Sequence, residues 1–197
     1  MVGVRSFLWH FSTYSRRVPK ERPDPRRFAA APWPGFLKAI SAGTTALLFI
    51  VTYFAARAIP PYGSAHTFGI AVAALPMAIP AIALLFVVTE FEVAHNNLLI
   101  KRLLWWTPVD LTGLQRVERY PEGFKGSLRV FGNGGLFSFT GIFWNKKLGR
   151  YRLFATDPSR FVAIFLPDRV VVVSPADPEA FIRSFGLPIA RSSAVAP

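Results

Sequence analysis

Two long stretches of apolar residues lie in the first half of the chain. They cover residues 39–56 and 67–88, and neither contains Asp, Glu, Lys or Arg. A helix needs about 20 apolar residues to cross a hydrocarbon core about 30 Å thick. The pattern therefore predicts two transmembrane helices that are retained rather than cleaved as a signal. The alternative is a pair of core helices in a soluble protein, where charge-free runs of this length are seldom needed.

The segment between the two stretches predicts a reversal of the chain. Residues 57–66 contain Pro60, Pro61 and Gly63, which interrupt helices and favour turns. Pro76 and Pro80 lie inside the second stretch, where neighbouring groups in a membrane protein can compensate for a kink. The two helices should therefore form an antiparallel hairpin.

Positive charge predicts the orientation of this hairpin. Of the 23 Lys and Arg residues, eight precede residue 39, one lies in the turn and fourteen follow residue 88. Because basic residues favour the cytoplasmic side, we expect a multi-pass protein of the inner (cytoplasmic) membrane with both termini in the cytoplasm. The part after residue 88 has a net charge of only +5, which argues against nucleic acid as a partner.

Residues 1–38 should form a basic cytoplasmic segment. Val4, Phe7, Leu8 and Phe11 have helical spacing and predict a short amphipathic helix on the inner leaflet. The alternative is a disordered tail made of the Pro- and Arg-rich run 18–27. Either form places basic side chains near anionic lipid headgroups.

From residue 89 the hydrophobic pattern changes to the alternation typical of β-strands. A first hairpin is expected to turn at His95, Asn96 and Asn97, because Asn tolerates left-handed backbone conformations. Further strands are expected at 111–119, 128–131, 136–139, 151–155, 161–166 and 170–173.

One helix is predicted to close the domain. Asp177 can cap it, Pro178 suits its first position, and Gly186 can end it. We therefore expect a mainly-β domain over 89–187, a barrel or sandwich closed at one end by this helix, and a disordered tail over 188–197, after a two-helix transmembrane hairpin over 39–88.

Three segments of the second half make the chain resemble the bacterial pleckstrin-homology (PH) domain proteins in which two transmembrane helices precede the domain. The segments are RVFGNGGLFSFTGIFWNKKLGRY at 129–151, ATDP at 155–158 and VVVSPADPEAF at 171–181. The resemblance covers about 36–187. It implies a seven-stranded barrel or sandwich closed by a C-terminal α-helix, together with a role at the membrane.

The Gly-rich segment could expose backbone N–H groups to a phosphate, but it lacks the Lys-Ser/Thr ending of a P-loop. A structural role in bulges and tight turns is the favoured interpretation, and an apolar loop that touches the bilayer or a partner is the alternative. The motif residues given this structural role are Gly132, Gly134, Gly135, Gly141 and Asn145.

Basic side chains suggest two contact sites for a lipid or a protein partner. Lys101 and Arg102 follow the first predicted hairpin turn, a place where eukaryotic PH domains often take phosphoinositide. A denser patch combines an aromatic residue with cations beside it and contains Trp144, Lys146, Lys147, Arg150 and Arg152. The alternative for this patch is a solvated turn and strand face.

The sequence offers little for catalysis. It contains no Cys, and its three His residues fall in separate segments, so we expect no catalytic residues, cofactor or metal. We expect a non-enzymatic, membrane-anchored module that binds a protein partner or its own copies at the cytoplasmic face of the bilayer. The alternatives are a sensor of anionic lipid surfaces and an accessory subunit of a membrane transporter or enzyme.

Overall fold

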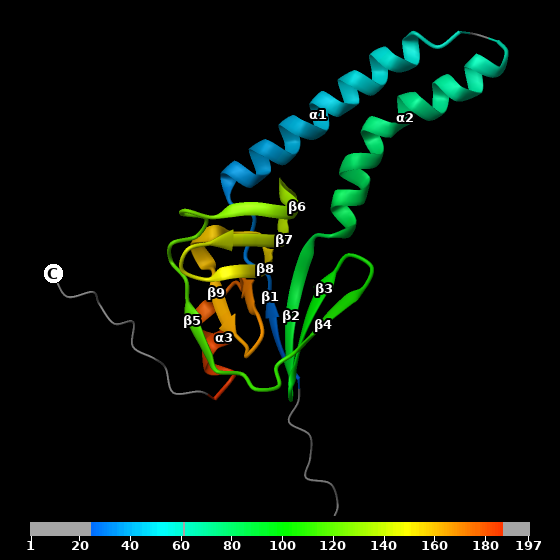
Figure 1. Ribbon diagram of the computed structural model, residues 1–197. Helices are drawn as coiled ribbons and strands as arrows, with labels where there is room; N and C mark the ends of the chain where they lie inside the picture. Colours follow the sequence, from blue (N-terminus) through cyan, green and yellow to red (C-terminus); the bar gives the residue numbers. More distant parts are fainter. Residues whose placement is uncertain (1–24, 61, 187–197) are drawn as a thin grey trace, which may run out of the picture.

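The computed structural model describes residues 25–60 and 62–186 and shows a helical hairpin that rises from a mainly-β domain (Figure 1). The helices are α1 (Gly35–Arg57) and α2 (Ser64–Leu85). The amphipathic helix expected over residues 4–11 and the tail expected over 188–197 lie outside the described residues.

Both helices are long and apolar enough to cross a membrane. The rest of the described chain covers little of them, since only 6% and 11% of their most apolar windows are buried. This exposure argues against the alternative of buried core helices. Helix α1 begins four residues before the predicted stretch because Lys38 continues the helix, whereas α2 begins and ends three residues earlier than expected.

Helix α2 changes direction along its length (Figure 1). Pro76 and Pro80 lie within it, and each lacks the N–H that would bond to the carbonyl four residues earlier. The helix nevertheless continues to Leu85 and leads through a short turn into the domain. Its last turns lie beside β6 (Leu128–Leu136).

The domain contains two sheets with ten strands. One sheet has the order β1-β2-β3-β4, with strands Arg26–Ala29, Val88–Ala94, Asn97–Arg102 and Trp106–Asp110. The other has the order β5-β9-β10-β8-β7-β6, with strands Arg116–Arg119, Val162–Phe165, Val170–Val173, Gly149–Ala155, Ser138–Asn145 and Leu128–Leu136. The 3₁₀ turn η1 (Pro158–Arg160) and the helix α3 (Pro178–Arg183) complete the fold.

The expected fold class is confirmed, with corrections to its detail. The two sheets are not joined into a closed barrel, and the described chain has ten strands rather than seven. The strand expected over 111–119 is right only in its second half, because Thr112 hydrogen-bonds to Asp110 and Gly113 turns the chain with a φ of +72°. The closing helix is present but short, and Asp177 caps it by accepting the N–H of Ala180 at 2.9 Å.

Two apolar clusters hold the domain together. The larger one lies between the sheets and includes Phe91, Ile100, Ile164 and Phe181, each fully buried. A second cluster joins β7, β8 and β10 to Leu37, which is in the first turn of α1 and is also fully buried. Each such side chain contributes about 1.5–3 kcal/mol to stability. The base of α1 is therefore part of the domain's core.

Strand β1 attaches the helical hairpin to the domain from its N-terminal side. It pairs with β2 along its whole length, and Arg27 Nε lies 3.0 Å from the Glu92 carboxylate. Between β1 and α1, the N–H of Ala31 donates to Ser174 O at 2.8 Å, and Thr156 Oγ1 donates to Ala31 O at 2.6 Å. The helical hairpin is thus an insertion between two paired strands, and both of its ends are fixed to the domain.

Candidate functional site

The β6–β7 hairpin carries most of the Gly-rich motif and contacts both helices (Figure 1). Gly132 and Gly141 are paired across it, with φ values of +115° and +146°. A Cβ on either residue would overlap the backbone of the opposite strand. The strands therefore approach closely here, next to a register shift between Arg129 and Phe131 that bends β6.

The tip of this hairpin is shaped by Asn133. Its Oδ1 accepts the N–H groups of Gly135 and Leu136 at 3.2 and 3.0 Å, and its Nδ2 donates to Leu136 O at 2.6 Å. These bonds close a turn in which Phe137 has a φ of +64°, a conformation that is unfavourable for a side chain of this size. Strained residues persist where the surrounding structure holds them in place, often at functional contacts, so the contacts of Phe137 are of interest.

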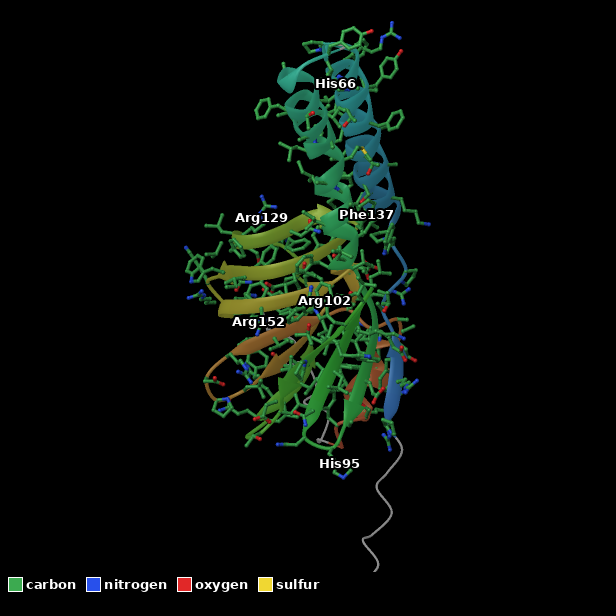
Figure 2. The ribbon with its side chains drawn as sticks, turned by 90° about the vertical axis from the view of Figure 1, so that its right-hand side faces the viewer. His66, His95, Arg102, Arg129, Phe137 and Arg152 are labelled. Carbon is green, nitrogen blue, oxygen red and sulfur yellow. The ribbon has the colours of Figure 1, made fainter. Side chains whose placement is uncertain are left out.

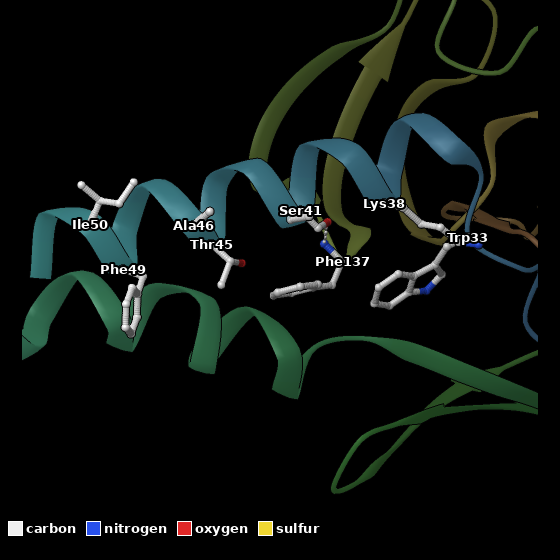
Figure 3. A pocket seen from close by; sticks show the side chains of 9 residues that line it. Trp33, Lys38, Ser41, Thr45, Ala46, Phe49, Ile50 and Phe137 are labelled. Atoms are coloured by element: carbon white, nitrogen blue, oxygen red, sulfur yellow. Dashed lines mark hydrogen bonds between the residues drawn. The ribbon is translucent and has the colours of Figure 1, made fainter. Parts of the chain in front are cut away.

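Phe137 fixes the tip of the hairpin to α1. Its N–H donates to Ser41 Oγ at 2.8 Å, and its ring centroid lies 5.8 Å from that of Trp33 (Figure 3). Both rings line an apolar groove of about 630 Å³ along α1, which also includes Thr45 and Phe49. The domain thus contacts the helical hairpin at a third point, in addition to the two places where the chain passes between the domain and the helices.

A second cavity, of about 580 Å³, lies where the last turns of α2 meet the domain. We call it the α2 cavity. Its walls come from α2, from the β6–β7 hairpin and from the ends of β3 and β8, and none of its lining residues is acidic. Most of the wall is apolar, while the charged lining residues are Arg102 and Arg152.

The two arginines of the α2 cavity lie beside the same aromatic ring. Their guanidinium carbons are 5.2 and 5.3 Å from the ring centroid of Phe154, and Arg102 also lies 5.1 Å from the ring of Phe86. Arg102 Nε donates to Thr107 Oγ1 at 3.0 Å. Within residues 25–60 and 62–186, neither arginine forms an ion pair.

Arg102 lies in an unfavourable electrostatic environment. Only 8% of its surface is exposed, and this burial lowers its pKa, which the charge of Arg152 lowers further. Arginine nevertheless remains charged at neutral pH. The cavity therefore concentrates positive charge that no described carboxylate balances.

The structure separates the basic residues that the sequence had grouped together. Lys101 is on β3 beside Arg102 but on the opposite face, where its Nζ lies 3.2 Å from the Glu90 carboxylate and 5.3 Å from the ring centroid of Trp106. Arg102 alone of this pair enters the α2 cavity. A neighbouring carboxylate thus compensates the charge of Lys101.

The patch expected around Trp144 lies at the β7–β8 turn, outside the α2 cavity. Lys147 pairs with Glu122, Trp144 is 41% exposed, and Lys146 and Arg150 are exposed on the surface. Asn145 organises this turn, since its Oδ1 accepts the N–H groups of Lys147 and Leu148 at 3.0 and 2.7 Å. Only Arg152 of this predicted patch reaches the α2 cavity.

Large apolar side chains are exposed on both sides of the α2 cavity. In the β3–β4 turn, Leu103 and Leu104 are 53% and 73% exposed, and Trp105 contacts Phe86 at the end of α2 with ring centroids 5.3 Å apart. In β6, the edge strand of its sheet, exposure reaches 75% at Phe131 and is also high at Leu128 and Val130. We call these two segments, residues 103–106 and 128–131, the apolar rims. Such patches mark surfaces that contact a membrane or a partner.

Metal-binding residues do not gather in the part of the chain that the structure describes. His66 is at the outer end of the helical hairpin, and His95 is at the opposite end of the molecule (Figure 2). The third histidine, His10, lies outside the described residues.

Sequence reasoning missed how Arg102 and Arg152 come together, and it missed the roles of Asn133 and Phe137. The two arginines are far apart in the sequence and lie on strands of different sheets, so no local pattern joins them. Strand alternation could have shown only that Lys101 and Arg102 face opposite ways.

Comparison with known families agrees with this architecture. The family model of the bacterial PH domain matches residues 89–186, the part of the chain that follows the two apolar helices. No curated protein and no solved structure matches the chain. Through residues 89–186, which start in β2 and end just after α3, this protein belongs to the bacterial PH domain family.

Proposed function

We propose that the protein is a non-enzymatic, membrane-anchored interaction module of the cytoplasmic membrane. The observation that carries this proposal is the insertion of the helical hairpin between the paired strands β1 and β2. Because both ends of the hairpin are bonded to the domain and Phe137 grips α1, the domain cannot move far from the bilayer that the helices cross.

The apolar rims support the same arrangement. Residues 103–106 and 128–131 lie near the ends of the helices that enter the domain. If the helices cross a bilayer, both segments lie at the interface between lipid and water. Trp and other large apolar side chains are favourable in that layer. The excess of basic residues outside the hairpin turn favours the cytoplasmic side for the domain.

The surface of the domain that faces away from the bilayer is then available to bind a protein partner or a second copy of the chain. Strands β4 and β5 are sheet edges, so each has a row of backbone groups without a neighbouring strand in the described residues. An extended segment of a partner can add to such an edge through main-chain hydrogen bonds. This mode of binding requires no catalytic group.

The orientation can be tested by single-cysteine labelling, because the natural chain contains no cysteine. His95→Cys reports on the far end of the domain, and His66→Cys reports on the outer end of the helical hairpin. With a membrane-impermeant maleimide, we expect His95→Cys to react only in inverted vesicles and His66→Cys only in right-side-out vesicles. The cysteine-free parent is the control, and labelling of His95→Cys in right-side-out vesicles would contradict the proposal.

Contact of the apolar rims with lipid can be tested with the same approach. An environment-sensitive fluorophore on Leu104→Cys or Phe131→Cys should report an apolar environment in proteoliposomes and be quenched by lipids that carry a quencher near the headgroup. The same fluorophore on His95→Cys should report water. Equal signals from all three positions would show that the domain does not lie with its rims in the interface.

A further inference from the structure

The α2 cavity contains a feature that an interaction module does not require. Two guanidinium groups line it, no acidic residue does, and one of the two is largely buried. Arg102 is withdrawn from water and lies near the like charge of Arg152, which disfavours the empty state, whereas an anion between the two groups would relieve both costs. The chemistry of the cavity therefore favours a negatively charged occupant.

The guanidinium group restricts which anion fits best. It presents its donors as a planar fork that matches the oxygens of a phosphate or a carboxylate, and two forks can hold one phosphate from two sides. Arg102 uses its Nε for Thr107, and only a long contact of 3.5 Å joins its Nη1 to Phe86 O. Its terminal nitrogens are thus available for a ligand, as is the whole side chain of Arg152 within the described residues.

The remaining wall of the cavity favours an occupant larger than a free ion. Ile79, Ile82 and Ala83 line it from the last turns of α2, opposite Phe131 and Ile142. The volume of about 580 Å³ is within the range of small-molecule sites, which is about 300–1,000 Å³, and far exceeds the needs of one phosphate ion. A ligand that fills this space needs a large apolar part next to its anionic group.

We propose that the α2 cavity binds one membrane phospholipid, with Arg102 and Arg152 holding its phosphate and the wall formed by α2 receiving the start of an acyl chain. This inference rests on the proposed membrane anchoring, because that anchoring places the end of α2 at the level of the lipid headgroups. Lipid from the same leaflet can then enter sideways between the apolar rims. The bound lipid would complete the contact between α2 and the β6–β7 hairpin.

Native mass spectrometry of the full chain, released from a mild detergent after addition of phosphatidylglycerol, tests the proposal. We expect the unmodified protein to retain one phospholipid, and Arg102→Gln and Arg152→Gln each to lower the retained fraction about tenfold, as for loss of a charge-assisted pair of hydrogen bonds. Arg150→Gln is the matched control, because it removes the same charge two residues away on β8 but outside the cavity. It should retain lipid as the parent does.

Two further measurements test whether the phosphate belongs to a lipid or is a free ion, and whether the acyl chain contributes to binding. Inorganic phosphate at millimolar concentration should not displace the phospholipid, and Ala83→Phe, which fills the apolar wall, should lower retention with both arginines intact. Equal retention in the parent and in both arginine variants, an equal loss in Arg150→Gln, or displacement by inorganic phosphate would overturn the proposal. Arg152 is exposed, so its variant keeps the test valid if Arg102→Gln does not fold.

The outcome is separable from that of the proposed function. Cysteine labelling reports whether the domain lies on the cytoplasmic side of the membrane, and lipid retention reports whether the α2 cavity is filled. Correct labelling together with no retained lipid would overturn this inference alone. Labelling on the wrong side would overturn the orientation whatever lipid is retained.

Discussion

The two ends of the PH-like domain differ in nearly every property that governs contact with a membrane. The end beside the helices carries exposed apolar rims and two arginines without ion pairs among the described residues. The far end, with His95 at its tip, is polar and internally bonded (Figure 2). There, Asp110 accepts hydrogen bonds from Thr112, and Asn96 bonds to both residues. Exposed apolar segments and guanidinium groups without ion pairs therefore occur together at the helix-side end of the described chain.

This difference follows from where the helices join the domain. Helix α2 leads through a short turn into β2, so β2 starts at the helix-side end and its turn with β3 comes after seven residues, about 20 Å away. The resemblance to PH domains suggested lipid contacts after this turn, at Lys101 and Arg102. Arg102 does lie beside the end of α2, at Phe86, because β3 runs back from the turn to the helix-side end. The end that we propose to face the lipid is therefore opposite the first hairpin turn.

The most severe way to disturb the helix-side end is to separate β6 from β7. In Gly141→Ala, the new Cβ would overlap the carbonyl of Phe131, and the φ of +146° is strained for any side chain. We expect a loss of roughly 3 kcal/mol or more in the free energy of unfolding, since neither backbone can give way easily. Thermal unfolding of the detergent-solubilised protein, with proteolysis of the β6–β7 hairpin, measures it.

Gly149→Ala is the control for this change. Gly149 also has a positive φ, +66°, but a Cβ there meets nothing within 4 Å. The expected cost is the backbone strain alone, about 1 kcal/mol. Similar losses in both variants would show that the close approach of the strands does not matter.

The next largest effect should come from the grip of the β6–β7 hairpin on α1. Phe137→Ala removes the contact with Trp33 and should cost about 2 kcal/mol, because the ring is only partly buried. Phe137→Gly removes the same ring and also relieves the φ of +64°, so it should be about 1 kcal/mol more stable than Phe137→Ala. Chemical denaturation of the two variants measures this difference, and an Ala variant as stable as the Gly variant would show that the turn is unstrained.

The sequence predicted the features that depend on neighbouring residues. The two helices, the strands near 151–155, 161–166 and 170–173, and the helix capped by Asp177 all follow from local patterns, and the structure has them. The strand β1 was missed because its four residues, Arg-Arg-Phe-Ala, carry no strand pattern and pair only with residues that lie beyond the helical hairpin. Its position is set by tertiary contacts such as that of Phe28 with Phe181.

The α2 cavity was missed for a similar reason. Arg102 was grouped with Lys101, and Arg152 with Arg150, because they are neighbours in the sequence. Strand alternation separates the first pair, and the packing of the two sheets brings Arg102 and Arg152 to one ring, that of Phe154. Without a known fold, the sequence contains no pattern that predicts contact between two residues so far apart in the chain.

A smaller effect isolates the hydrogen bond between helix and domain. In Ser41→Ala, the N–H of Phe137 loses its acceptor, and we expect a cost of about 1 kcal/mol in the free energy of unfolding. Thr52→Ala is the control on the same helix, because the buried Thr52 hydroxyl has no hydrogen-bond partner among the described residues. Thr52→Ala should cost nothing. Equal effects of the two substitutions, compared by thermal unfolding, would show that the contact with Phe137 contributes no stability.

The smallest effect concerns the polar far end and its pH dependence. The hydroxyl and the N–H of Thr112 donate to Asp110 at 2.7 and 2.9 Å, and these bonds lower the pKa of Asp110. The stability that they contribute is therefore fully present above the ordinary aspartate pKa, about 4, and is lost as the pH falls through the lowered value. Thr112→Val should raise the pKa of Asp110 in a carbon-13 NMR titration, and Thr112→Ser should leave it low. An unchanged titration in Thr112→Val would mean that the hydroxyl does not stabilise the carboxylate, and that the far end is less tightly bonded than its geometry indicates.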